Sequence, residues 1–156
     1  MKDDMKKVMM QGLLAVAVAL GASGAAAAAD DENGCTSETL HGRYVFAARG
    51  FTIAAGVAQP KAIVEVIDFD GDGAVSAPLA TVSVNGRILR FSPGGSGKYT
   101  VDDACTGTIE FDGNGPTFDI VASARGGEIW MIQTNPNTVF QGTATRTLRA
   151  HDHDRE

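Results

Sequence analysis

The sequence has 156 residues, of which 44% are hydrophobic, 21% are charged and 6% are aromatic, and its formal net charge is -6. This length suits one domain with its own core, and the composition differs from that of the apolar-poor, highly charged chains that stay disordered. The acidic balance argues against a broad nucleic-acid-binding surface, which needs clustered Lys and Arg. We therefore expect a globular domain that does not bind nucleic acid.

Residues 1–29 have the pattern of a signal peptide. A basic start at Lys2, Lys6 and Lys7 precedes an apolar run over residues 12–20, which is too short for a permanent membrane helix. The segment ends at residues 27–29 in an Ala-x-Ala cleavage signature. We expect cleavage after Ala29 and a secreted or periplasmic protein that is not inserted into a membrane.

Cys35 and Cys105 are the only cysteines of the chain. An even pair in an oxidising compartment predicts a disulfide. Closing the long loop between the two residues is worth about 4 kcal/mol in the chain-entropy account. The alternative, a nucleophilic Cys105, lacks a nearby His. We expect the bridge to tether an N-terminal segment, residues 30–41, to the domain.

The remaining chain has short runs of Val, Ile, Thr and Phe that alternate with Gly, Asn, Asp and Pro, and it lacks the periodicity of amphipathic helices. The predicted strands are residues 43–48, 62–69, 74–85, 87–92, 98–101, 106–111, 117–123, 128–134 and 139–148. Asn85-Gly86 and similar pairs suit two-residue hairpin turns. Because closure removes exposed edges, the pattern predicts an all-β, antiparallel up-and-down barrel of about eight strands over residues 42–148, with a charged tail over residues 149–156.

The order of five short motifs resembles a known family. These are Gly42-Arg43-Tyr44-x-Phe46, Phe69 to Gly73, Gly97 to Val101, Cys105 to Thr108, and Ile132 to Thr134 together with Gly142 to Arg146. They are similar to small secreted bacterial domains related to the allene-oxide-cyclase-like, calycin-type barrels. The resemblance implies that fold and an activity on apolar substrates, since plant members are isomerase-cyclases of fatty-acid epoxides and bacterial relatives cyclise polyketide-like molecules. None of their catalytic residues can be matched here, so catalytic residues stay unknown.

No metal site or cofactor is expected. Residues 68–73 match the first half of a calcium-binding EF-hand loop, but Leu79 stands where that loop needs its bidentate Glu, so a hairpin turn is the favoured interpretation. The sequence His151-Asp152-His153-Asp154 lacks the further ligands of a zinc site, so a solvated tail is expected.

Three residues on predicted strands are candidates for ligand binding. Glu65 shares a strand face with Ile63 and Ile67; an outward Glu that limits aggregation is the favoured reading, whereas an inward Glu would have a raised pKa and could serve as acid, base or ligand anchor. Tyr44 and Trp130 are among the large rings expected mainly in the core, and small strand residues could leave room beside them for a ligand.

Three functions fit this sequence. The favoured one is a non-catalytic binder of a small apolar molecule or envelope component. The alternatives are a cyclase or isomerase of a fatty-acid-like or polyketide-like substrate, and a structural or adhesive domain with a filled barrel. An enzyme would need a well-placed acid or base inside the barrel, whereas a binder needs mainly shape and an apolar wall.

Overall fold

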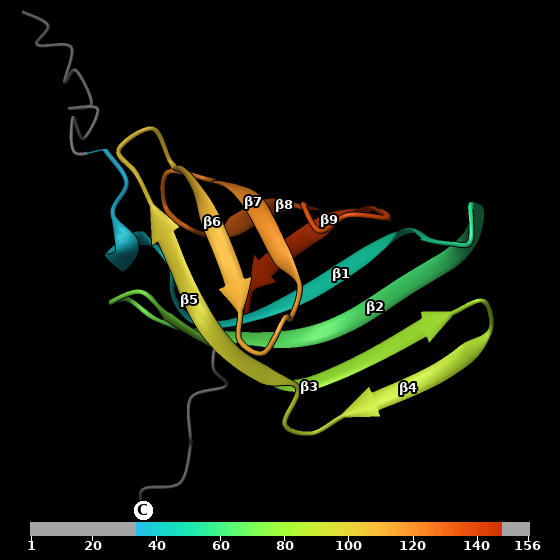
Figure 1. The fold of residues 1–156 in the computed structure, drawn as a ribbon. Helices are drawn as coiled ribbons and strands as arrows, with labels where there is room; N and C mark the ends of the chain where they lie inside the picture. Colours follow the sequence, from blue (N-terminus) through green and yellow to red (C-terminus); the bar gives the residue numbers. More distant parts are fainter. Residues whose placement is uncertain (1–33, 148–156) are drawn as a thin grey trace, which may run out of the picture. The chain divides into compact units, whose positions relative to one another are not determined.

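The computed structural model describes residues 34–147, which form a short 3-10 helix and nine β-strands (Figure 1). The elements are η1 (Ser37–Thr39), β1 (His41–Ala54), β2 (Val57–Asp70), β3 (Ala74–Val84), β4 (Arg87–Phe91), β5 (Gly95–Val101), β6 (Thr106–Phe111), β7 (Thr117–Ala122), β8 (Glu128–Gln133) and β9 (Thr138–Arg146). The predicted signal peptide and the charged tail lie outside the described residues. Within residues 34–147, no helix is long and apolar enough to cross a membrane.

Eight of the strands close into an antiparallel barrel, as the sequence predicts. Their order is β2-β1-β9-β8-β7-β6-β5-β3, and β3 pairs back with β2 to complete the ring. The ninth strand, β4, pairs only with β3, because β3 divides one of its edges between two partners. Residues Ala74 to Ala77 pair with β5, and residues Ala80 to Val84 pair with β4. The prediction of a barrel is confirmed, with β4 as an addition to the ring.

Turn chemistry explains two of the hairpins. Asn85 and Gly86 join β3 to β4 with φ values of 47° and 81°, the left-handed conformation that a two-residue hairpin turn requires. At the β2–β3 turn, a carboxylate oxygen of Asp70 accepts the backbone N–H of Asp72 at 2.7 Å and that of Ala74 at 2.9 Å. These hydrogen bonds lower the pKa of Asp70, and the bond from Asp72 has the largest effect. The EF-hand-like residues therefore form a turn between strands.

The hairpin of β1 and β2 is much longer than predicted. Its strands continue to Ala54 and restart at Val57, around a turn at Ala55 and Gly56 with φ values of 50° and 78°. The predicted boundaries of 43–48 and 62–69 are wrong there because the turn lacks Asn, Asp and Pro. In Figure 1 this hairpin and the β3–β4 hairpin extend to the same side of the ring.

The core fills the ring with side chains from each of its strands. Among its largest members are Tyr44, Phe46, Ile67, Phe69, Tyr99, Ile109, Phe118, Ile120, Ile129, Met131 and Phe140. Phe69 makes edge-to-face contacts with the rings of Tyr44 and Tyr99, at centroid distances of 5.1 and 4.9 Å. Such pairs add roughly 0.5–1.5 kcal/mol each beyond the burial of their area. This packing fixes the positions of the strands that carry the candidate residues.

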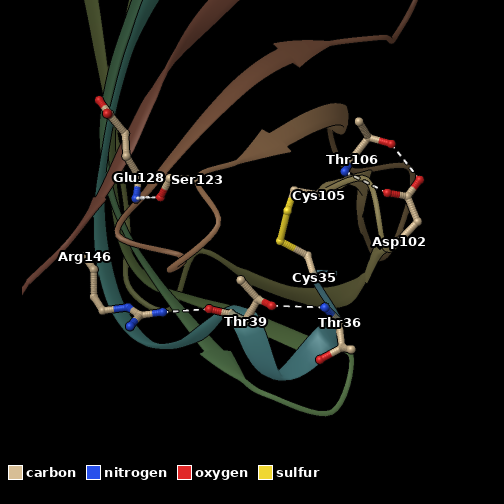
Figure 2. The surroundings of a disulfide bond; sticks show 9 residues. All are labelled: Cys35, Thr36, Thr39, Asp102, Cys105, Thr106, Ser123, Glu128 and Arg146. Atoms are coloured by element: carbon tan, nitrogen blue, oxygen red, sulfur yellow. Dashed lines mark hydrogen bonds between the residues drawn. A yellow bond between two sulfur atoms is a disulfide. The ribbon is translucent and has the colours of Figure 1, made fainter. Parts of the chain in front are cut away.

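Residues 35–40 close one end of the barrel, and we call them the N-terminal plug. The predicted disulfide between Cys35 and Cys105 is present and joins the plug to the turn before β6 (Figure 2). Leu40 is completely buried, and the hydroxyl of Tyr99 lies 2.9 Å from the carbonyl oxygens of both Ser37 and Leu40. These contacts hold the plug at the end of the ring where β1 begins.

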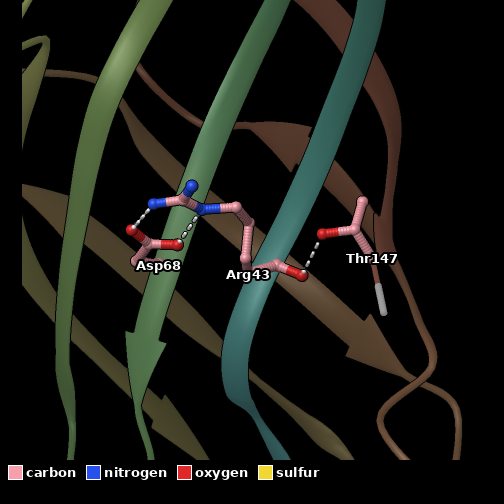
Figure 3. Close-up of polar contacts among 3 residues, drawn as sticks. All are labelled: Arg43, Asp68 and Thr147. Carbon is pink, nitrogen blue, oxygen red and sulfur yellow. Dashed lines mark hydrogen bonds and ion pairs between the residues drawn. The ribbon is translucent and has the colours of Figure 1, made fainter. Parts of the chain in front are cut away.

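A surface ion pair supports the neighbouring strands β1 and β2. The guanidinium of Arg43 donates two hydrogen bonds of 2.8 Å to the carboxylate of Asp68, directly across the two strands (Figure 3). The hydroxyl of Thr147 donates to the carbonyl of Arg43 at 3.2 Å. Both charged side chains are substantially exposed, so this pair contributes little to stability compared with the core.

Candidate functional site

The end of the ring opposite the plug is only partly covered, and we call it the open end. Its inward-facing side chains come from the long hairpins, where cross-strand register places Ile63, Val82 and Leu89 in one row. All three are partly exposed, and Phe91, which faces the same way, is 43% exposed. The open end therefore presents apolar side chains to solvent on the inner face of the barrel wall.

Glu65 lies on this inner face and is only 9% exposed. Its neighbours across the strands are Phe46 on β1 and Ala80 on β3, and Phe91 follows on β4. The favoured prediction of an outward Glu65 is wrong, because β2 turns the face of Ile67 and Phe69 toward the core and Glu65 shares that face.

Burial controls the acidity of Glu65. Loss of solvent around the carboxyl raises its pKa to about 7, against the weaker opposing attraction of Lys61. Within residues 34–147, no hydrogen bond reaches this carboxyl. At neutral pH it is therefore present both as a proton donor and as a carboxylate, so it can bind either kind of polar group or transfer a proton.

Lys61 is another charged group on the inner face, four residues before Glu65. Its ammonium donates to the side-chain oxygen of Gln133 at 3.0 Å and lies 4.2 Å from the ring centroid of Phe140. Gly50 on β1 is the direct cross-strand neighbour of both Lys61 on β2 and Phe140 on β9. Burial lowers the pKa of Lys61. Sequence reasoning missed this residue, since Lys near a strand end usually faces solvent.

A polar chain fixes the partner of Lys61. The amide nitrogen of Gln133 donates to the side-chain oxygen of Asn135 at 2.8 Å, and the same oxygen accepts the backbone N–H of Thr117 at 2.7 Å. These bonds connect the β8–β9 loop to the start of β7. Lys61 is thereby held at the open end, beside Phe140 and on the same face as Glu65.

Tyr44 is a structural residue of the plugged end. Its ring is completely buried, its hydroxyl donates to the carbonyl of Gly126, and it accepts a hydrogen bond of 2.9 Å from Arg146. Arg146 also donates to the carbonyl of Thr39 at 2.7 Å, visible in Figure 2. Tyr44 thus joins the core to the plug.

Trp130 lies on the outer face of the barrel and is 48% exposed. The expectation of a core ring is wrong for this residue, because β8 turns Ile129 and Met131 inward and therefore Trp130 outward. Tyr44 and Glu65 share the inner face, whereas Trp130 is on the other side of the wall. The three candidates do not form one site.

The outer face carries a groove of about 830 Å³ beside Trp130. It crosses β7, β8, β9, β1 and β2, and we call it the outer groove. It is lined by Ala47, Ala48, Arg49, Ala62, Ile63, Asp119, Ile120, Val121, Trp130, Met131, Ile132, Gln141, Gly142 and Thr143. The inward-facing members contribute the floor through their backbone, and the outward-facing members form the two rims.

No family model, curated protein or solved structure matches the chain. The resemblance to allene-oxide-cyclase-like barrels therefore stays a prediction. A barrel fold does not by itself specify a ligand, because one architecture serves many unrelated functions.

Proposed function

We propose that this protein is an exported binder of a small, largely apolar molecule that carries one polar group. The observation that carries the proposal is the inward carboxyl of Glu65 at the open end, which makes no hydrogen bond with any described residue. The carboxyl oxygens reach solvent, because every fully buried side-chain oxygen or nitrogen of the described residues has a hydrogen-bond partner. A polar group of the ligand would replace water at this carboxyl and would approach it from the open end.

The surroundings of Glu65 favour an apolar ligand body. Ile63, Leu89 and Phe91 share its face on neighbouring strands and are partly or substantially exposed. Covering such side chains with an apolar molecule is favourable by about 25 cal/mol for each Å² removed from water. Ligand sites commonly combine an apolar lining with few polar groups, as the open end does.

Export is part of the proposal. A disulfide persists in oxidising compartments and is rare in the cytosol, and Cys35 and Cys105 form one. The signal-peptide pattern of residues 1–29 agrees with this location. The closed eight-strand ring is also what a calycin-type relationship would require, and we propose that relationship on the strength of the sequence motifs.

Glu65 also supports a second candidate, a cyclase or isomerase of an apolar substrate. A carboxyl with a pKa of about 7 can donate and accept protons at neutral pH, which acid-base catalysis needs. The Glu65→Gln variant tests the second candidate: an enzyme would retain binding and lose turnover in this variant, whereas a binder would show no turnover in either form.

The test combines native mass spectrometry with a fluorescent probe. The oxidised protein, purified from its own compartment, should carry a small molecule whose mass is lost on denaturation. It should also bind N-phenylnaphthylamine, an apolar probe with one N–H donor, and Phe91→Ala should weaken this binding by about tenfold or more. Phe51→Ala is the matched control, since Phe51 is similarly exposed, at 44%, but faces outward on β1.

Absence of both a carried molecule and probe binding would contradict the proposal. Equal affinity loss in the Phe91 and Phe51 variants would also contradict it, because the probe would then not occupy the open end.

A further inference from the structure

We propose that the outer groove is a second binding site, for a neutral saccharide chain. This inference is independent of the open end, because the two sites lie on opposite faces of the same wall. Three features carry it: the arrangement of the rims, the exposed ring of Trp130, and polar side chains that have no partner within the described residues.

The register of five strands builds the two rims. On one rim, Val121, Trp130, Thr143 and Ala47 are consecutive cross-strand neighbours. On the other rim the neighbours are Asp119, Ile132, Gln141, Arg49 and Ala62. Between them runs the backbone of the residues that face inward. Four steps between strands of about 4.8 Å each make the groove about 19 Å long, which suits a chain rather than a single small molecule.

Trp130 provides a rigid apolar platform on one rim. Its side chain is 48% exposed on a strand whose backbone is paired on both sides, with β7 and with β9. A pyranose ring with equatorial hydroxyls has flat faces of C–H groups, and such a face packs on an indole ring through apolar contact. The exposed Val121 and Ile132 extend this apolar contact on either side.

The opposite rim provides hydrogen-bonding groups that are not used within the protein. The side chains of Arg49, Asp119 and Gln141 make no hydrogen bond or ion pair with any residue in the described range. Together they offer a guanidinium that donates, a carboxylate that accepts and an amide that can do both. This set suits hydroxyl groups, which both donate and accept hydrogen bonds.

The same polar rim disfavours the other occupants of an exposed groove. A lipid chain would bury Arg49, Asp119 and Gln141 without partners, which is unfavourable for each of these groups. The rim carries one positive and one negative side chain, so the groove gives no net attraction to a charged polymer. A neutral saccharide satisfies both rims at once.

The chain has a single tryptophan, so its fluorescence reports directly on this groove. We expect the oxidised protein to show a saturable change in Trp130 emission when titrated with cellohexaose or with the hexamer of N-acetylglucosamine. Isothermal calorimetry should give the same affinity. Absence of both a fluorescence change and heat with these two saccharides would overturn the proposal.

Four variants locate the binding. Gln141→Ala and Asp119→Asn should weaken saccharide binding several-fold while keeping the tryptophan signal, and Trp130→Ala should abolish the calorimetric heat. Phe51→Ala, an outward aromatic beside the groove residues but outside the lining, should bind as the wild type does. Equal weakening by Phe51→Ala would overturn the assignment to the groove.

The open-end proposal and the outer-groove proposal can be tested independently of each other. Glu65→Gln should leave saccharide affinity unchanged, and saturating N-phenylnaphthylamine should not compete with the saccharide. If either changed the affinity severalfold, the saccharide would lie at the open end and the outer groove would not be its site.

Discussion

At the scale of single residues, the inward carboxyl of Glu65 determines how the barrel responds to pH. A carboxyl whose pKa is raised by burial costs the folded state free energy once it ionises. Its pKa moves from an ordinary value of 4.5 to about 7 on folding. The contribution of Glu65 to stability is therefore greatest below pH 4.5, and it is lost as the pH rises through 7.

The substitution Glu65→Gln should remove this pH dependence. The shift of the Glu65 pKa from 4.5 to about 7 corresponds to about 3 kcal/mol. The free energy of unfolding of the variant should therefore exceed that of the wild type by about this amount well above pH 7, and should match it near pH 4. Urea unfolding across this pH range measures the difference. Glu110→Gln, at an exposed position of β6, controls for the loss of one carboxylate. Parallel pH profiles for Glu65→Gln and wild type would show that the carboxyl is not desolvated.

The sequence identifies the face of Glu65 but not the direction in which that face points. Alternation places it with Ile63, Ile67 and Phe69, which the structure confirms. The direction depends on the neighbouring strands, which the alternation of one strand does not specify. The direction of Trp130 could not be predicted for the same reason. Strand β8 is apolar on both faces over Ile129 to Ile132, and only the closure of the barrel determines which face is outside.

At the scale of elements, the turns account for what could be predicted and what could not. Asn85-Gly86 and the Asp70 turn carry strong local signals, and the strands beside them begin and end within one residue of the prediction. The turn at Ala55 and Gly56 carries no such signal, so the long ends of β1 and β2 were not predictable. Those ends form part of the inner face at the open end, and Lys61 lies on them. The hydrogen bonds of the N-terminal plug were not predictable either, because their partners are far away in sequence.

The contact between the plug and the β7–β8 turn gives a prediction for two glycines. A Cβ at Gly126 would lie 2.0 Å from the carbonyl oxygen of Thr39, whereas a Cβ at Gly113 would meet nothing within 4 Å. Their φ values are similar, at 61° and 66°. Gly113→Ala should therefore cost only the left-handed strain, roughly 1–2 kcal/mol, and Gly126→Ala should cost distinctly more because the plug must move.

Urea unfolding measures both costs, and hydrogen exchange tests their cause. Gly126→Ala should speed exchange of the backbone N–H groups of Thr39 and Leu40, which are hydrogen bonded within the plug. Gly113→Ala should not affect them. Equal unfolding free energies for the two variants would mean that the plug tolerates displacement at no cost.

At the scale of the whole molecule, closure of the ring and the disulfide stabilise the fold in different ways. The ring closes through backbone pairing of β2 with β3, from Lys61 with Val84 to Phe69 with Val75. The disulfide spans a sequence separation of 70 and restricts mainly the unfolded chain. Loss of the disulfide should thus lower the free energy of unfolding without opening the ring.

The double variant Cys35→Ser, Cys105→Ser should remain a folded barrel and lose about 4 kcal/mol of stability. Urea unfolding of the variant, of the oxidised wild type and of the reduced wild type measures this. The reduced wild type should match the variant, and reductant should not change the variant. An unchanged midpoint after reduction would show that the plug is held by its hydrogen bonds and Leu40 alone.

The described chain begins and ends at the plugged end of the barrel. Cys35 is hydrogen bonded beside the β5–β6 turn, and the backbone N–H of Thr147 donates to the carbonyl of Arg43 near the start of β1. The Ala55-Gly56 turn lies at the far end of the long hairpin. A circular permutant that joins residue 147 to residue 34 through a flexible linker, and opens between Ala55 and Gly56, would keep all the strand pairings. It would transfer both free ends to the open end, where a fused domain could cover the inner face around Glu65 and leave the plug as a continuous internal segment.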